Sequence, residues 1–392
     1  MADQDPFESN PERLLEFGQQ VSASISGALV FMRQKFKPVS TEGNKVDSGG
    51  WSQFLQEEQK PPTATGTACI ISAMVAAGES KNSEILTLGK RLLIEHVRED
   101  GGWSKPSLER YYSLTLITCL ALRALLDAGQ PSLSEPVQGG VRWLLDAQNP
   151  DGGWGNLARD NISDTTSTAY ALRVLTRVIT SQPGVETAVK RGHKWFTDGQ
   201  NPDGSWGRHP GEPGTLPHTA HATEALLLCG VDAVSMLPVR EWLISNLSNS
   251  SQFQEHYLVK VPDGRTERLF WTHLTDERAL IALLRLGADI TSPQVYALAR
   301  RILARQAEGN YWAIDTVPYT APSWAIVEAV LSLRLYLDYI ERQGSLIALS
   351  KTMSDLKDVV KAQADRISEL ESQLDKQPAS FMDRLRRLFG SR

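Results

Sequence analysis

The sequence predicts an all-α fold: a single (α/α)6 toroid of six helical hairpins, followed by a C-terminal coiled-coil helix. The first observation is a repeat. Tryptophans directly after a Gly-Gly or Gly-Ser pair fall at Trp51, Trp103, Trp154 and Trp206, at spacings of 52, 51 and 52 residues, and Trp312 lies two periods further on. The second is that each turn is followed by two segments, and in each segment apolar residues recur every three or four positions. The third is a heptad pattern near the C-terminal end.

The first two regions of the chain supply the hairpins. Residues 1–44 contain an amphipathic segment, PERLLEFGQQVSASISGALVFMRQKF, that can serve as an outer helix. Residues 45–341 alternate small-residue segments with more strongly amphipathic ones. No hairpin can bury its own apolar face, so the hairpins must stack, as a linear solenoid or as a closed ring. The small residues favour the ring, because the inner helices must converge. The expected inner segments are TATGTACIISAMVAAG, YYSLTLITCLALRALLDAG, DTTSTAYALRVLTRV, PHTAHATEALLLCG, TDERALIALLRLGA and APSWAIVEAVLSLRLYL.

The turns between hairpins repeat a motif whose first role is structural. Gln148 precedes Trp154 by six residues and Gln200 precedes Trp206 by the same distance, with Asp-Gly between them. Asp-Gly favours a tight turn with positive φ, and the indole is a large apolar body with one hydrogen-bond donor. The glutamine amide can bridge the turn and tie one hairpin to the next. The turn near VPDGRTERLFW keeps Asp-Gly but has drifted from the pattern.

These residues carry a family resemblance. Gln148-x3-Gly-x-Trp154 and Gln200-x3-Gly-x-Trp206 match the QW motif, which Gln306-x3-Asn-x-Trp312 matches only weakly. Over roughly residues 45–340 the chain resembles the α/α-toroid superfamily of squalene–hopene cyclases, other class II terpene cyclases and protein prenyltransferase β-subunits. The resemblance implies a central cavity with functional groups at the starts of the inner helices.

The resemblance to class II cyclases places an Asp-x-Asp-Asp motif at Asn161–Asp164. Only the last carboxylate of that motif remains, as Asp164, and Ser163 stands where the family has its general acid. A hydroxyl is too weak an acid to protonate an alkene. Asp164 is therefore the one catalytic candidate, and helix capping is the alternative role for it.

The resemblance to prenyltransferases suggests a metal. His218 falls at the position of the zinc-binding histidine, while Asp164 occupies the cysteine position and Ile162 the aspartate position. His218, Asp164 and His221 could bind Zn²⁺ or Mg²⁺, although no cofactor is certain. The alternative is that both histidines have structural roles at a helix start.

Six residues near the starts of inner helices are candidates for lining a ligand cavity. Aromatic side chains there can also be ordinary core, and Asp276 can be a first-turn charge that the helix dipole favours. The six are Tyr112, Ser163, His218, His221, Asp276 and Trp324.

Residues 342–376 carry four heptads with an apolar seam running from Leu346 to Leu374, interrupted by Gln363. One helix cannot bury such a seam, so residues 346–374 should self-associate or dock on a coiled-coil partner; folding back on the ring is the alternative. Residues 377–392 form a basic amphipathic segment. Within it, residues 380–392 could contact a partner or, weakly, a membrane surface.

The composition argues against some classes of partner and some locations. Net charge is -5 without a concentrated basic face, which argues against nucleic acid. Neither a signal peptide nor an apolar run of about 18 residues is visible, and three cysteines lack disulfide-like spacing. A cytoplasmic protein is expected.

Two functions follow from these features. The first is a toroid that binds a hydrophobic or isoprenoid ligand, or a protein, and is assembled through its coiled coil without standard catalysis. The second is a divergent enzyme of isoprenoid diphosphate chemistry that uses Asp164, His218 and His221. The first is favoured because Ser163 and Ile162 replace residues that the family chemistries require.

Overall fold

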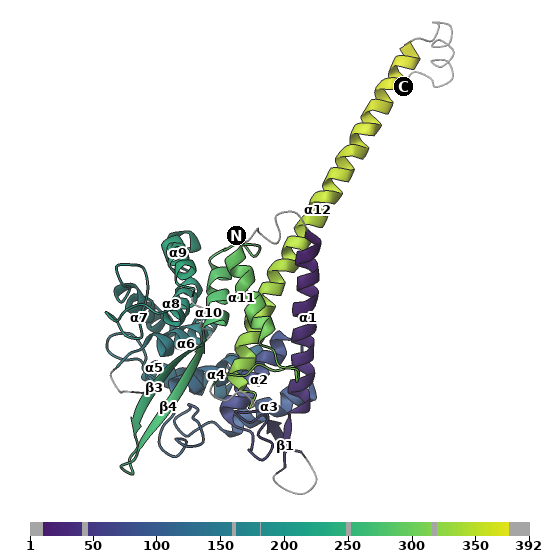
Figure 1. The fold of residues 1–392 in the computed structure, drawn as a ribbon. Coiled ribbons are helices and arrows are strands. Elements are labelled where there is room, and N and C mark those ends of the chain that lie inside the picture. The colour runs from purple at the N-terminus through teal and green to yellow at the C-terminus, as the bar shows by residue number, and fades with distance from the viewer. Residues whose placement is uncertain are drawn as a thin grey trace. The chain divides into compact units, whose positions relative to one another are not determined.

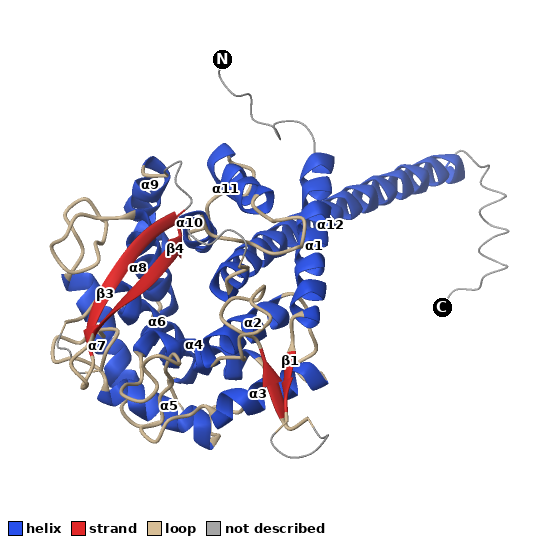
Figure 2. Ribbon diagram, turned by 60° about the horizontal axis from the view of Figure 1, so that its bottom comes forward, coloured by secondary structure: helices blue, strands red, loops and turns tan. Residues whose placement is uncertain are grey.

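The computed structural model describes residues 11–40, 46–158, 162–180, 182–247, 252–315 and 320–375. The chain divides into two units, residues 1–338 and 339–392. In the first unit, helices form a ring of two layers (Figure 2), so the predicted all-α toroid is confirmed. The inner helices are α2 (Ala64–Ala76), α4 (Thr115–Asp127), α6 (Thr165–Leu175), α8 (Leu216–Leu228), α10 (Thr275–Arg285) and the start of α12 (Ser323–Asp375). The outer helices are α1 (Pro11–Gln34), α3 (Glu84–Glu95), α5 (Glu135–Asp146), α7 (Val185–Asp198), α9 (Leu237–Ser245) and α11 (Pro293–Ala304).

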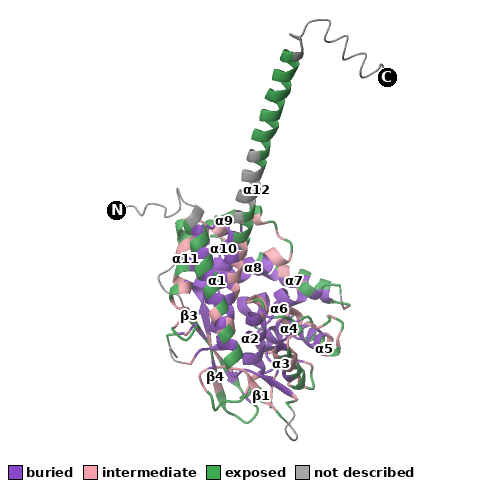
Figure 3. Ribbon diagram, turned by 90° about the vertical axis from the view of Figure 1, so that its right-hand side faces the viewer, coloured by how far each residue is buried: buried purple, intermediate pink, exposed green. Residues whose placement is uncertain are grey.

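The inner helices are buried on nearly every side, as Figure 3 shows by colour. All residues of α6 are buried, and so is α2 from Ala64 to Met74. Ala, Gly, Ser and Thr dominate these two helices, and such small side chains let neighbouring backbones approach closely. The outer helices instead bury one face and expose the other, as amphipathic helices at a surface do.

The ring closes between the start of α12 and the loop before α2. The inner helices from α2 to α10 pack on one another in chain order. The backbone N–H of Ser323 donates to the carbonyl of Gln53 (2.9 Å), and that of Leu55 donates to the carbonyl of Ala321 (3.0 Å). Backbone hydrogen bonds therefore join the last inner helix to the first.

The repeated tryptophans fasten each turn to both layers. The indole N–H of Trp154 donates to the carbonyl of Leu144 at the end of α5 (2.8 Å), and its backbone N–H donates to Thr168 Oγ1 in α6 (2.9 Å). Three other tryptophans repeat the indole bond to the carbonyl ten residues earlier, and Trp51 makes its own to Met32. The five are at most 2% exposed: Trp51, Trp103, Trp154, Trp206 and Trp312. Each indole binds a carbonyl near the end of an outer helix and so fixes the turn that leads to the next inner helix.

The glutamines of these turns bond across the turn or to the next hairpin. Gln148 Nε2 donates to the carbonyl of Gly152 (2.8 Å) and to that of Ala188 in α7 (2.9 Å). Gln200 Nε2 bonds across its own turn. Gln306 Nε2 donates to Ser24 in α1 (3.0 Å), so the outer layer is tied from α11 to α1.

The chain inserts a β-hairpin between α9 and α10, where the sequence predicted only a drifted turn. Strand β3 (Gln252–Lys260) pairs antiparallel with β4 (Thr266–Leu274). Gly264, at φ 88°, forms the tight turn, and Asp263 Oδ1 accepts from the backbone N–H of Arg265. Figure 1 shows the two strands side by side, next to the helices of the ring. Hairpin residues line a cavity together with residues at the starts of α2, α4 and α12. The structure also has a short pair of strands, β1 (Lys37–Val39) and β2 (Ser48–Gly50), and two 3-10 helices, Thr176–Val178 and Ala233–Met236.

A cluster of buried charges lies among the inner helices. Glu224 of α8 pairs with Arg173 of α6 (2.6 Å) and Arg278 of α10 (3.5 Å), and Arg285 lies 3.4 Å from its other oxygen. Arg278 also pairs with Glu328 of α12. Because buried ions demand close partners, this network favours one rotational position of each helix.

The second unit is described here through the continuation of α12 to Asp375. Of the predicted seam, Met353, Leu356, Val360 and Ile367 are about half exposed or more. Self-association through this seam stays a prediction. The side chains of Leu346 and Leu374, and all of residues 377–392, lie outside the described part of the chain.

Among the described helices, not one combines the length and the apolar character that crossing a bilayer needs.

Candidate functional site

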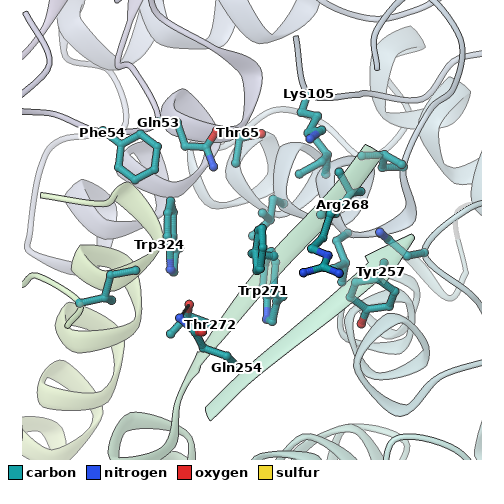
Figure 4. Close-up of a pocket in the computed structure, with 18 residues that line it drawn as sticks. Gln53, Phe54, Thr65, Lys105, Gln254, Tyr257, Arg268, Trp271, Thr272 and Trp324 are labelled. Atoms are coloured by element: carbon teal, nitrogen blue, oxygen red, sulfur yellow. Dashed lines mark hydrogen bonds between the residues drawn. The ribbon is translucent and has the colours of Figure 1, made fainter. Parts of the chain in front are cut away.

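A cavity of about 490 Å³ lies between the starts of α2, α4 and α12 and strand β4 (Figure 4). Its apolar lining comes from Phe54, Leu114, Leu116, Ile117, Leu120, Leu269, Phe270, Trp271, Ile314 and Trp324. Its polar lining comes from Gln53, Thr65, Lys105, Asn156, Gln254, Tyr257, Arg268 and Thr272. The volume and the apolar character are those of a small-molecule site.

Aromatic rings form two sides of the cavity. Figure 4 shows Trp324 of α12 and Trp271 of β4 on opposite sides of the space. Trp324 is held by an edge-to-face contact with Phe54, with ring centroids 5.3 Å apart, and Trp271 by a similar contact with Tyr170 at 6.1 Å. The walls are therefore large, apolar and fixed by neighbouring rings.

Three buried polar atoms on the lining have no hydrogen-bond partner among the described residues. They are the indole nitrogen of Trp324, the hydroxyl oxygen of Thr65 and the side-chain carbonyl oxygen of Asn156. Thr65 is 5% exposed and Asn156 is 6% exposed. Buried polar groups nearly always have partners, so these atoms are available to hydrogen-bond a ligand.

The charged residues of the lining are both cationic. Lys105 is half-buried and lies 3.4 Å from Glu267, and Arg268 is exposed with its guanidinium near the Phe270 ring. The lining contains no carboxylate. The cavity therefore suits an apolar molecule with a negatively charged end.

Next to this cavity, three buried side chains meet where the hairpin enters the ring. Glu255 of β3 places Oε1 3.0 Å from His218 Nε2, and Oε2 2.9 Å from His273 Nε2 of β4. All three side chains are at most 5% exposed. Thr215, the N-cap of α8, lies 2.7 Å from His218 Nδ1 through its hydroxyl and so orients that ring.

The cluster is electrostatically polarised. Burial opposes ionisation of Glu255, but the two imidazoles outweigh it and hold the pKa of that carboxyl below its usual range. Burial lowers the pKa of His273 to about 4. Near neutral pH the cluster therefore holds a carboxylate beside a neutral His273.

Asp164 is the N-cap of α6. Its Oδ1 accepts from the backbone N–H of Ser167 (2.7 Å) and its Oδ2 from the Ser167 hydroxyl (2.8 Å). Burial raises the pKa of Asp164 to about 6. It lines a second cavity of about 370 Å³, together with Arg208, Tyr257 and seven other residues.

Of the six residues predicted to line a cavity, Trp324 alone lines the larger one. Ser163 is turned back to Asp151 (2.7 Å), and the Tyr112 hydroxyl donates to the carbonyl of Lys260 (3.2 Å). Asp276 pairs with Arg301 of the outer helix α11 (2.6 Å). These side chains at or near helix starts thus form hydrogen bonds or ion pairs with a turn, with the hairpin or with an outer helix.

The predicted metal set is also rearranged. His221 Nδ1 lies 2.8 Å from Arg173 Nη2, and burial lowers the pKa of His221 well below its usual range. Among the described residues, the group with metal-ligand spacing contains His218 with Glu255 and His273, and Asp164 and His221 do not belong to it.

Sequence reasoning missed Glu255 and His273 because it assigned no strands there. The signal was present as alternation: Phe253, Glu255 and Tyr257 share one face of β3 and lie less exposed than the residues between them.

Comparisons with known proteins agree with this geometry. Residues 111–222 match the squalene–hopene cyclase C-terminal domain family. The chain superposes on a variant of the type II terpene cyclase MstE from Scytonema, in complex with geranylgeranyl dihydroxybenzoate, with a TM-score of 0.54 and 16% identity, covering 82% of this chain and 98% of that one. The chain has the α/α-toroid fold of the type II terpene cyclases.

Curated relatives of this toroid include terpene cyclases. A squalene–hopene cyclase from Zymomonas mobilis is 28% identical over 191 residues, which cover 42% of this chain and 28% of the relative. A drimenyl diphosphate synthase from Streptantibioticus cattleyicolor is 36% identical over 173 residues, covering 43% of this chain and 31% of the relative. The chain thus spans less than a third of the length of these relatives, and the match supports the fold without assigning their activities.

The same fold also occurs in a protein named for different chemistry. An α-amylase from Clostridium perfringens superposes with a TM-score of 0.52 at 10% identity, covering 70% of this chain and 87% of that one. The function of this toroid must therefore be argued from its own side chains.

Proposed function

We propose that this toroid is a binding module for an amphipathic isoprenoid ligand. The apolar chain of the ligand occupies the cavity between Trp271 and Trp324, and its anionic end lies toward Lys105 and Arg268. The observation that carries the proposal is the aromatic cavity of about 490 Å³, in which buried polar atoms await partners.

Contact chemistry supports an isoprenoid over a polar ligand. Burying each methylene group contributes roughly 0.8 kcal/mol, so a branched hydrocarbon chain gains most from these walls. Both charged residues of the lining are cations, and although Lys105 is paired with Glu267, Arg268 favours a diphosphate or carboxylate end. One structural neighbour is named as a complex with geranylgeranyl dihydroxybenzoate, and one relative is named a drimenyl diphosphate synthase.

The acid site supports binding more than cyclase chemistry. Both oxygens of Asp164 accept hydrogen bonds from Ser167, and Ser163 is occupied by the preceding turn. In addition, Asp164 lines the smaller cavity and not the aromatic one. These contacts describe a capping residue.

One observation favours a second function, proton-dependent isoprenoid chemistry. A carboxyl group with a pKa of about 6 retains part of its protons near neutral pH and can act as a general acid. Asn156 and Tyr257 line both cavities, so a ligand in the larger one could extend toward Asp164.

Assembly is the remaining part of the proposal. The seam over residues 346–374 would join copies of the toroid, or recruit a coiled-coil partner, and linked sites gain avidity without new contacts.

The test uses isothermal titration of the full chain with farnesyl diphosphate, geranylgeranyl diphosphate, farnesol and inorganic diphosphate. We expect both prenyl diphosphates to bind, farnesol to bind more weakly and diphosphate alone to show negligible binding. Ile117→Trp should fill the cavity and abolish binding, whereas Leu133→Trp on the exposed surface should not. Arg268→Gln removes one charge-assisted contact, so it should weaken the binding of both prenyl diphosphates about tenfold and leave the binding of farnesol unchanged.

Two outcomes would decide against the proposal. If neither prenyl diphosphate binds the wild-type chain, or if Ile117→Trp binds as tightly as wild type, the cavity is not the site. Mass spectrometry of the same mixtures separates the two functions, because a new product that disappears in Asp164→Asn would indicate an enzyme.

A further inference from the structure

The cluster of His218, Glu255 and His273 offers the ligand set of a divalent metal. The three residues come from three elements, α8, β3 and β4, and one nitrogen or oxygen of each lies within 4.8 Å of the others. Two imidazoles and a carboxylate are ligands that zinc and other first-row transition metals prefer. Magnesium is less suited, because it prefers oxygen ligands and retains water.

The spacing is close to what a metal requires. In a tetrahedral zinc site with bonds of about 2.0–2.1 Å, ligand atoms stand about 3.3 Å apart. Here Glu255 lies 3.0 Å from His218 Nε2 and 2.9 Å from His273 Nε2. These two distances involve different oxygens of Glu255, and the ligand atoms of the three residues all lie within 4.8 Å of one another, so side-chain rotation would bring one oxygen and two nitrogens around a single ion.

Hydrogen bonding within the protein does not satisfy the cluster. His218 Nε2 is close to Glu255, but it lacks the alignment of a hydrogen bond, and neither it nor His273 Nδ1 has a partner among the described residues. The Thr215 contact at Nδ1 is compatible with either tautomer of His218. In the tautomer whose proton is on Nδ1, the Nε2 lone pair faces the carboxylate, which is the arrangement of two ligands of one cation. A lone pair and a negative charge repel each other in a buried site unless a cation lies between them.

We propose that His218, Glu255 and His273 bind one transition-metal ion, with Zn²⁺ as the test ion. The ion would fasten both strands of the hairpin to α8. Three protein ligands leave a fourth position for water or a ligand atom, as in catalytic zinc sites. The contact between Thr215 and His218 is the kind of outer hydrogen bond that fixes a ligand imidazole.

This site is separate from the proposed ligand cavity. None of its three residues lines that cavity, so either proposal can fail alone. Its nearest decoy is His221, which is equally buried, lies one turn from His218 on α8, and places its ring 5.4 Å from that of His273. His221 Nδ1 instead faces Arg173, which makes this histidine a matched control.

The experiment uses tag-free full chain that has been stripped of metal by a chelator. Titration with Zn²⁺ should give one ion per chain and raise the thermal midpoint by about 5 °C at a hundredfold excess over Kd. Glu255→Gln and His273→Gln should each weaken Zn²⁺ affinity at least about 100-fold, since loss of a ligand exceeds loss of an outer contact. His221→Gln should retain wild-type affinity.

X-ray absorption at the zinc edge of the wild-type chain gives a readout that needs no variant. Two imidazoles with oxygen in the remaining positions are expected, and sulfur or a single imidazole would overturn the assignment. The proposal also fails if the wild-type chain binds well below one ion, or if folded Glu255→Gln and His273→Gln bind as tightly as wild type. Circular dichroism of the metal-free variants establishes that they fold.

Discussion

Replacing Trp154 should reveal how much stability one repeat turn supplies. The indole is fully buried, and it donates to the carbonyl of Leu144 at 2.8 Å. On its far side it packs against Gly192 of α7, where an added Cβ would lie 2.9 Å from the ring. Truncating such a ring to alanine removes the apolar contacts, leaves a cavity and deprives a buried carbonyl of its partner.

The expected cost is worked from these contacts. Trp154→Ala should lower the free energy of unfolding by about 3–5 kcal/mol, the usual range for a buried aromatic residue. Trp154→Phe keeps most of the apolar contact but loses the indole donor, so we expect about 1–2 kcal/mol. At roughly 2 °C per kcal/mol in a domain of this size, the alanine variant should melt about 6–10 °C lower.

Guanidinium unfolding followed by circular dichroism measures this difference, because the other nine tryptophans complicate fluorescence. The matched control is Trp242→Phe, which removes a half-buried indole whose N–H reaches Asp203 at the surface (3.1 Å). That control should cost about 1 kcal/mol or less. If Trp154→Ala unfolds at the same denaturant concentration as the control, the tryptophan does not hold the turn, and the structural interpretation of the repeat is wrong.

Three further predictions concern charge and assembly. The pKa of Asp164 is raised to about 6 in the folded state, so the folded chain binds a proton more tightly than the unfolded chain does. As the pH rises from 4 to 6, the free energy of unfolding should therefore fall by about 3 kcal/mol more in wild type than in Asp164→Asn, as paired denaturant curves would show. Asp164→Asn falling as steeply would contradict this. Glu224→Gln leaves Arg173 and Arg285 without the carboxylate that they pair with, whereas Arg278 keeps Glu328, and the change should cost about 3–5 kcal/mol in thermal unfolding. Glu186→Gln, which breaks only a surface pair with Lys190, should leave the thermal midpoint almost unchanged; equal effects of the two variants would show that the network does not stabilise the fold. Deleting residues 346–392 should turn an oligomer into a folded monomer by light scattering, and Val360→Asp should do the same; unchanged mass in both would exclude the coiled coil.

The toroid was predictable because single tryptophans, which recur at a regular spacing, each fix the geometry of one turn. From Trp103 onward, each repeat tryptophan bonds to the carbonyl ten residues earlier, so a period in the sequence becomes a period in space. The small residues of α2 and α6 likewise predict helices that converge. Both signals are local, and each repeat reinforces the others.

The site was less predictable, because a polar residue at a helix start can serve either a cavity or the backbone. Asp164 and Ser163 looked like remnants of an acid site, yet Asp164 accepts hydrogen bonds from Ser167 in its own helix and Ser163 donates to Asp151 in the preceding turn. The sequence cannot distinguish these roles, since a cap and a catalytic carboxylate occupy the same position and need the same residue type. Trp324, which was predicted to line a ligand cavity, lies on the lining of the aromatic cavity, and its indole N–H has no partner among the described residues; a ligand there stays a prediction.

The repeat that departs from the pattern supplies most of the distinctive chemistry. Of the three clustered residues, His218 belongs to a helix of the ring, whereas Glu255 and His273 belong to the hairpin that interrupts the repeat. The same strands close the aromatic cavity with Trp271 and Arg268. Burying a carboxylate between two imidazoles is unfavourable unless its partners are fixed. A ring that needed only to be closed could have used apolar side chains there. The hairpin that interrupts the repeat thus supplies residues to both proposed sites, the aromatic cavity and the metal cluster.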